Sequence, residues 1–202
     1  MPDRQLEEDF STRLGGGPIA GVDEVGRGPL AGPVITAAVI LPGGIHFDGL
    51  DDSKRLTARR REQLFHDLTR HAVYAVGAAS RADIDRLNIL HATMLAMVRS
   101  VTRLPQIPAG VLVDGNRIPP DMPFPAEAVV KGDGKSSSIA AASIIAKVTR
   151  DKIMGVLSDR YPTYGWNSNS GYPTAAHKSA ILEHGITAHH RRTFRPVSDM
   201  FS

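Results

Sequence analysis

Apolar and polar positions along the chain form strand-like runs separated by helix-like periods. A short apolar stretch at residues 19–23 and a nearly continuous β-branched run at residues 33–41 predict two buried strands. The linker between them, residues 26–32, is short, so a hairpin-like antiparallel pair is expected. Similar patterns predict further strands at residues 72–79, 110–115 and 126–130.

Helical periods fill most of the intervals between these strands. Thr57, Ser80 and Thr174 are suited to cap three of the helices, the last of which runs through Leu182. A long helix is predicted at 139–160, with small residues in its first turns that favour close packing on the sheet. A loose helix is expected within residues 1–17. The Ser80 helix carries one apolar face, formed by Ile84, Leu87, His91, Met94, Val98 and Val101.

This mixture of clustered strands and helices predicts an α/β fold with a mixed β-sheet flanked by helices. No internal repeat or low-complexity stretch is present. The 202 residues are therefore expected to form a single domain, 1–202, with a core at 18–160 and a small helical C-terminal part at 161–202.

Composition narrows the class of protein. Hydrophobic residues make up 42% of the chain and charged residues 22%, as in ordinary globular proteins. The absence of cysteine excludes disulfides and thiolate metal sites. No apolar stretch suits a membrane span and the first ten residues do not resemble a signal segment, so a cytoplasmic protein is expected.

The net charge of +3 is small, but the basic residues are clustered. The clusters are 54–55, 59–61 and 189–192, and together they suit an anionic polymer such as a nucleic acid. A solvated basic surface is the alternative for any single cluster.

Four acidic residues stand at or just after predicted strand ends. Asp23 and Glu24 precede a glycine hinge, Asp114 ends the strand at 110–115, and Asp133 follows the strand at 126–130. Strand ends of an open sheet gather side chains at one edge, where carboxylates suit Mg²⁺ or Mn²⁺, as one ion or two. Taken singly, the first pair could cap a turn, and Asp114 could belong to an Asp-Gly turn.

Neighbouring strand residues point to opposite faces, so Asp23 and Glu24 should not both reach one pocket from a regular strand. A distortion at residues 25–26, or coordination through the Glu24 carbonyl, would resolve the conflict.

Other residues could contact a substrate. The flexible segment Gly26-Arg27-Gly28 could donate hydrogen bonds to a ribose or phosphate, and Lys54 could meet a phosphate. Tyr172, in a polar loop, could stack on a base or sugar. The alternatives are an ordinary turn, a surface loop and a partly buried ring.

Three further polar residues are given no such role. Asp151 is expected to pair with Arg150 or Lys147, and it is kept only as an outside candidate for a ligand. The histidines at 177 and 184 are assigned no function.

Together these motifs resemble bacterial ribonuclease HII, the type 2 ribonuclease H family. The matching segments lie between residues 19 and 197, and the longest are 21–34 and 139–151. The others are 52–54, 113–115, 130–136, 171–177 and 190–197.

The resemblance implies a ribonuclease H-like fold and endonucleolytic cleavage of RNA in RNA–DNA hybrids, including one ribonucleotide embedded in duplex DNA. It implies cleavage 5′ of that ribonucleotide, leaving 5′-phosphate and 3′-hydroxyl ends. The family's metal-binding acids fall on Asp23, Glu24, Asp114 and Asp133.

The same resemblance assigns roles to the substrate-binding residues. The loop that senses the ribose 2′-hydroxyl falls on Gly26, Arg27 and Gly28. The tyrosine that packs on the following deoxyribose falls on Tyr172, in the C-terminal part, and a phosphate-contacting lysine falls on Lys54.

Two other functions remain open: a DNA-cutting nuclease or transposase on the same fold, and an inactive nucleic-acid binder. The chain is expected to act as a monomer on its nucleic-acid substrate, away from membranes.

Overall fold

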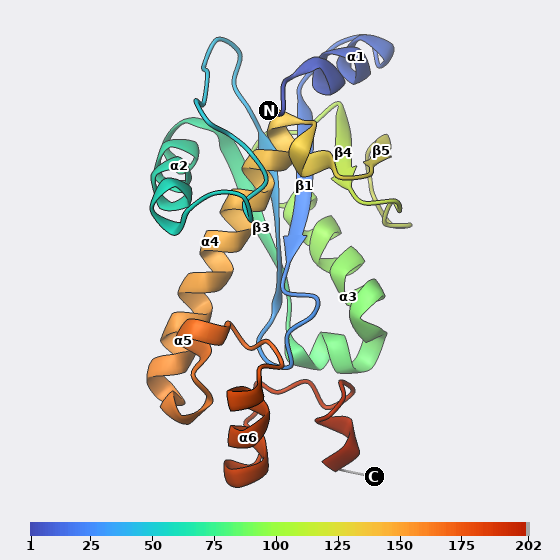
Figure 1. Cartoon of the computed structure of the whole chain (residues 1–202). Coiled ribbons are helices and arrows are strands. Elements are labelled where there is room, and N and C mark those ends of the chain that lie inside the picture. Colours follow the sequence, from blue (N-terminus) through green and yellow to red (C-terminus); the bar gives the residue numbers. More distant parts are fainter. Residues whose placement is uncertain (201–202) are drawn as a thin grey trace.

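The computed structural model describes residues 1–200 and is centred on a five-stranded sheet (Figure 1). Its order is β3-β2-β1-β4-β5. The strands β1 and β2 are antiparallel, as are β2 and β3, whereas β4 runs parallel to β1 and to β5. The predicted mixed sheet and hairpin-like pair are therefore confirmed. The strands are β1 (Ile19–Val25), β2 (Val34–Ile40), β3 (Val73–Ala79), β4 (Gly110–Asp114) and β5 (Ala126–Val129).

Helices cover both faces of this sheet (Figure 1). The helix α4 packs on β1 and β2 from one side, with α2 against it, and α3 packs on β1, β2 and β3 from the other. The helices are α1 (Gln5–Arg13), α2 (Ala58–His71), α3 (Arg81–Thr102), α4 (Ser137–Arg160), α5 (Trp166–Asn169) and α6 (Ala175–His184). The short α5 was not predicted, and α1 lies within the expected range 1–17. No helix within residues 1–200 combines the length and apolarity needed to cross a bilayer.

The predicted helix caps are present. The side chains of Thr57, Ser80 and Thr174 each accept a hydrogen bond from a backbone N–H of the first turn, at 3.1–3.2 Å. At Ser80, the carboxylate of Asp83 also accepts from the cap's own N–H, completing a capping box. These contacts explain where α2, α3 and α6 begin.

Small residues let α4 approach the sheet closely, as predicted. The segment 140–143 is buried, and it lies behind β1. Gly21 in β1 has no space for a side chain, because an added Cβ would collide with the backbone of Ser138 and Ile139. This contact places the first turns of α4 behind the strand that carries Asp23 and Glu24.

The apolar face predicted for α3 is only partly correct, because the helix is kinked. Asn88 has φ 63° and ψ 169°, and its Oδ1 accepts hydrogen bonds from the N–H groups of Leu90 and His91. Asn88 thereby caps a second helical segment that is rotated relative to the first. His91 is consequently exposed rather than buried. The buried positions of the second segment are Ala92, Thr93, Ala96, Met97, Ser100 and Val101.

The C-terminal part packs on the loop that follows β1 through a small apolar cluster. Leu30, Ala31 and Met154 meet side chains from beyond residue 160. Those side chains are Tyr164, Trp166, Ala180, Ile181 and Val197.

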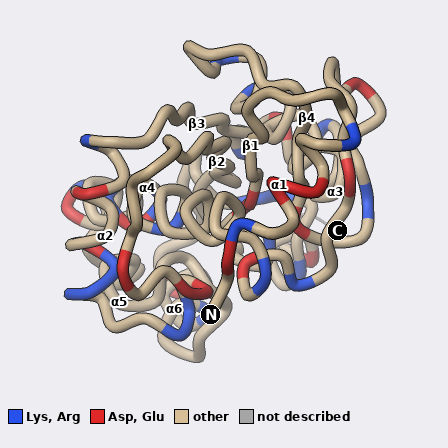
Figure 2. Tube along the Cα trace, turned by 90° about the horizontal axis from the view of Figure 1, so that it is seen from above, with Lys and Arg blue, Asp and Glu red and all other residues tan. Residues whose placement is uncertain are grey.

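The basic run at 189–192 is neither a cluster open to an anionic polymer, as predicted, nor the alternative solvated surface, because His190 and Arg191 are fully buried. Viewed from above, lysine and arginine positions are spread over several elements rather than gathered on one side (Figure 2). The distribution of lysine and arginine therefore does not indicate one face of the molecule as the binding site of an anionic partner.

Two buried histidines in this part are held neutral by their partners. The Nδ1 of His177 faces the carbonyl of Tyr172 at 2.9 Å and must carry its proton, while its Nε2 accepts from Trp166 Nε1 at 3.0 Å. His190 Nδ1 accepts from the N–H of Thr187, so its Nε2 donates to His177 Nε2 at 3.1 Å. Burial, together with the neighbouring His177 and His189, lowers the pKa of His190 from 6.5 to about 4.

We expect this burial to make stability depend on pH. Above pH 6.5 His190 is neutral in both states, but between about pH 6.5 and 4 only the unfolded chain takes up the proton. Stability should therefore fall across this range as pH drops. Urea midpoints at pH 7.5 and 5.0 should differ less in His190→Asn than in the wild-type protein. An equal pH dependence in both proteins would contradict the assignment, and His91→Asn, at an exposed histidine, is the matched control.

Candidate active site

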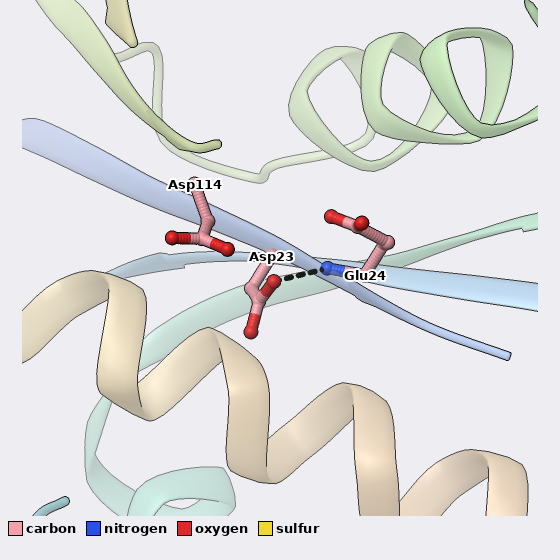
Figure 3. Close-up of side chains that lie close together, drawn as sticks. All are labelled: Asp23, Glu24 and Asp114. Carbon is pink, nitrogen blue, oxygen red and sulfur yellow. Dashed lines mark hydrogen bonds between the residues drawn. The ribbon is translucent and has the colours of Figure 1, made fainter. Parts of the chain in front are cut away.

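Three carboxylates converge at one edge of the sheet. Asp23 and Glu24 lie near the end of β1, and Asp114 is the last residue of β4. One oxygen atom from each lies within 4.8 Å of the other two (Figure 3). Because β1 and β4 are parallel neighbours with Val22 opposite Val113, the residues that follow are brought side by side. This parallel pairing unites acids that are about ninety positions apart in sequence.

The expectation that Asp23 and Glu24 cannot both reach one site from a regular strand is wrong. The strand stays paired with β2 in regular register through Glu24 and Val25, which face Thr36 and Ile35. Asp23 folds back so that its Oδ1 accepts the N–H of Glu24 at 2.7 Å (Figure 3). Glu24 starts from the other side of the strand, and its longer side chain brings one oxygen to the same edge.

The acids are placed where their charges are costly. Asp23 is only 7% exposed. Burial raises its pKa well above the usual value, and the charges of Glu24 and Asp114 raise it further. Burial also raises the pKa of Glu24, although Arg27, 3.3 Å away, opposes the rise. A cation at this point would offset the repulsion, and the all-oxygen donor set suits a hard divalent ion.

Asp133 lies beside this group of three but outside it. It sits in the 3₁₀ turn η1 (Gly132–Gly134), whose Gly132 N–H donates to Asp114 Oδ1 at 2.7 Å. Burial raises the pKa of Asp133, and the charges of Asp52 and Asp114 add to the rise. The negative charge of Asp114 therefore acts on Asp133. The role of Asp133 as a fourth metal ligand stays a prediction.

Lys54 is a second cation, besides Arg27, near these acids. Burial tends to lower its pKa, but the carboxylates of Asp52, Asp23, Asp133 and Asp114 outweigh burial and raise it. Its phosphate contact stays a prediction. Asp151 instead pairs with Lys147 at 2.7 Å, which confirms it as an ion-pair partner.

The predicted recognition residues lie together. Gly26, Arg27 and Gly28 form the loop directly after β1, and the ring of Tyr172 lies against Gly28, 3.4 Å from where a Cβ would stand. The side chain of Tyr172 is 44% exposed, so its ring is open to a ligand. The fold thus brings the loop and the tyrosine next to each other from positions 144 residues apart.

A hollow of about 290 Å³ opens beside the acids. Glu24, Arg27 and Asp114 line one side of it, and α3 lines another with Met94 and Met97. No sequence pattern indicates this hollow, because Met94 belongs to the apolar face that predicts a packed helix.

Two buried arginines behind the recognition loop were also missed. Arg150 is 1% exposed and Arg191 is 0% exposed. Both donate to backbone carbonyls of residues 26–33, the segment that joins β1 to β2. Their only sequence signal was position: one lies in a helix otherwise rich in small and apolar residues, the other in a basic run.

Comparison with known proteins agrees with this geometry. A family model described as ribonuclease HII matches residues 20–197. The chain belongs to the ribonuclease HII family. Ribonuclease HII of Paracoccus denitrificans is 56% identical over 196 residues, covering 97% of this chain and 93% of that protein. Ribonuclease HII of Shewanella amazonensis is 55% identical over 197 residues, covering 97% and 95%.

Solved structures confirm a ribonuclease H-like fold. Ribonuclease H2 of Pyrococcus horikoshii superimposes with a TM-score of 0.75 at 28% identity, covering 91% of this chain and 96% of that one. A Bst ribonuclease HIII solved in complex with Mn²⁺ gives a TM-score of 0.74 at 20% identity, covering 98% and 74%, and supports the fold alone.

Repulsion among the acids should lower the melting temperature of the metal-free protein. Asp23→Asn removes one buried charge and keeps an oxygen that can accept the Glu24 N–H. Without divalent ions, the variant should melt roughly 2–4 °C higher than wild type, the shift that about 1 kcal/mol produces in a domain of this size. Adding Mn²⁺ should stabilise the wild-type protein more than the variant.

Thermal melts with and without Mn²⁺ measure both effects, with the exposed Asp159→Asn as the control. A lower melting temperature for metal-free Asp23→Asn, or an undiminished response to Mn²⁺, would contradict this account of the acidic site.

Proposed function

We propose that this ribonuclease HII family member is an endoribonuclease. It hydrolyses the RNA strand of RNA–DNA hybrids and nicks duplex DNA on the 5′ side of a single embedded ribonucleotide. The observation that carries the proposal is the convergence of Asp23, Glu24 and Asp114 beside the Gly26–Gly28 loop. The reaction adds water across the phosphodiester, breaks the bond to the 3′-oxygen upstream, and leaves 3′-hydroxyl and 5′-phosphate ends.

The residues at this edge fit a divalent metal. Asp23, Glu24 and Asp114 offer converging oxygens, and burial together with the charges of Glu24 and Asp114 raises the pKa of Asp23, a cost that a cation would offset. Asp133 would complete the set from η1. A bound Mg²⁺ or Mn²⁺ would supply the positive charge that activates water and stabilises the leaving oxygen of a phosphodiester.

The chain's own residues would place the substrate. The Gly26–Gly28 loop offers N–H groups to the ribose 2′-hydroxyl, and Tyr172 offers a ring face to the neighbouring deoxyribose. Lys54 would hold a phosphate near the acids while remaining charged, since the surrounding carboxylates raise its pKa.

A nicking assay tests the function directly. A labelled DNA duplex holding one ribonucleotide is incubated with the protein and Mg²⁺ or Mn²⁺. We expect one nick 5′ of the ribonucleotide, and none in an all-DNA duplex. Asp23→Asn should abolish the nick while leaving duplex binding largely intact, because it removes a metal ligand but no phosphate contact. Near-normal turnover in this variant would refute the metal assignment.

The same assay separates two alternatives. Cutting of the all-DNA duplex would identify a DNA nuclease on this fold, and tight binding without cutting would identify an inactive binder. The closeness of Gly28 to Tyr172 favours recognition of a ribose–deoxyribose boundary over both.

Removal of the Arg27 side chain tests whether the Gly26–Gly28 loop recognises the ribonucleotide. Arg27→Ala should lower kcat/KM for the ribonucleotide duplex by about tenfold, and change affinity for the all-DNA duplex by less than about threefold. The reason is that Arg27 lies beside Glu24 at the reacting edge, where it would contact the junction. Equal losses in both measurements would mean that Arg27 is only a general phosphate contact.

Several expectations stay predictions within this proposal. They are a monomeric state, a cytoplasmic location, and the division into a core at 18–160 and a substrate-contacting C-terminal part at 161–202.

A further inference from the structure

The loop that follows β1 is held from inside the fold by two guanidinium groups. Arg191 donates from Nε and Nη2 to the carbonyl of Gly32, from Nη1 to that of Arg27 at 2.8 Å, and from Nη2 to that of Gly26. Arg150 donates to the carbonyls of Ala31 and Pro33 at 3.1 and 3.0 Å. Five carbonyls of one short loop are therefore turned inward.

These arginines are not members of ion pairs. Within residues 1–200 neither forms a salt bridge, although Asp151 and Asp85 lie near enough to influence Arg150 and Arg191 respectively. Burial and, to a lesser extent, the charge of Arg150 lower the pKa of Arg191 to about 9. Two like charges buried near each other are expensive, so a simple packing role would be better filled by apolar side chains.

Arg191 fixes the direction of the peptide groups in the Gly26–Gly28 loop. A trans peptide carries its C=O and the following N–H on opposite sides. With the carbonyls of Gly26 and Arg27 turned toward Arg191, the N–H groups of Arg27 and Gly28 point away from the core. Neither N–H has a hydrogen-bond partner within residues 1–200. The loop therefore presents two successive free donors outward.

Arg150 fixes the distance between this loop and Tyr172. Its Nη1 donates to the carbonyl of Ser170 at 3.0 Å, while its other nitrogens hold Ala31 and Pro33. The N–H of Leu30 adds a bond to the carbonyl of Gly171 at 2.7 Å.

The Arg150 side chain packs tightly against the backbone of Gly26. Gly26 has φ 93°, and an added Cβ there would collide with the Arg150 side chain.

We propose that Arg150 and Arg191 are positioning residues that set the preference for a ribonucleotide. They do so by holding the donors of the Gly26–Gly28 loop outward and beside Tyr172. This inference rests on the proposed function. Neither arginine touches substrate, because both lie beneath the loop and are buried.

Lysine at either position tests the inference. Arg191→Lys and Arg150→Lys keep the charge but lose the planar fork that reaches several carbonyls at once. For each variant we would measure kcat/KM on the duplex with one ribonucleotide and the association constant for an all-DNA duplex. The ratio of the two values is the readout. Because both values scale with the folded fraction of the same preparation, the ratio is unaffected by partial unfolding.

We expect both variants to lower this ratio by at least about tenfold, the scale of loss that follows small misplacement of a binding group. Arg4→Lys is the matched control, since Arg4 also donates to two carbonyls, those of Leu41 and Pro42, but away from the loop. It should leave the ratio within about twofold of wild type.

A double variant separates positioning from general stability. If Arg191 acts by holding the donors of the loop, Gly28→Pro, which removes the Gly28 N–H, combined with Arg191→Lys should lower the ratio by clearly less than the product of the two single losses. Unchanged ratios in both lysine variants, or fully additive losses in the double variant, would overturn the inference. A wild-type protein that fails to nick the ribonucleotide duplex would instead overturn the proposed function, and this role with it.

Discussion

Repulsion among three carboxylates is the constraint on which the rest of the site depends. Asp23, Glu24 and Asp114 hold oxygens within 4.8 Å of one another, and Asp23 is buried. Such an arrangement persists only when the surrounding fold is rigid enough to impose it. Here the rigidity comes from the parallel pairing of β1 with β4 and from α4, which packs directly on β1.

The recognition side of the site depends on the same strand. The Gly26–Gly28 loop leaves β1 at Val25, so any shift of that strand would move both the acids and the loop. Arg150, in α4, donates to the carbonyl of Pro33 in the segment that joins β1 to β2. Arg191, in the C-terminal part, donates to the carbonyl of Arg27 in the same segment. The chemistry and the discrimination proposed for this protein are thus built on one rigid unit, although its residues come from distant parts of the chain.

Much of this could be predicted from the sequence because the signals were local. The strands at 19–23 and 33–41, the caps at Thr57 and Ser80, and the small residues at 140–143 each depend on near neighbours. The acids were recognisable because each one ended or followed an apolar run. Their closeness could only be inferred, since it depends on which strands pair.

What the sequence missed was set by tertiary contacts. The exposure of His91 follows from a kink at Asn88, where no glycine or proline in the sequence indicates a break in the helix. The sequence does not show that Asp23 and Glu24 reach one edge from a regular strand, because this depends on the length of the Glu24 side chain and on the bend of the Asp23 side chain. The sequence indicates only a possible ion pair for Arg150 and a basic cluster for Arg191, whereas their burial depends on the carbonyls of a loop more than a hundred positions away along the chain.

The most direct test of the central claim is a crystal structure of the protein soaked with Mn²⁺, with the metal located by anomalous scattering. The account predicts a strong anomalous peak bonded to carboxylate oxygens of Asp23, Glu24 and Asp114. Manganese bound only elsewhere, or no ordered peak at this edge of the sheet at saturating Mn²⁺, would contradict it.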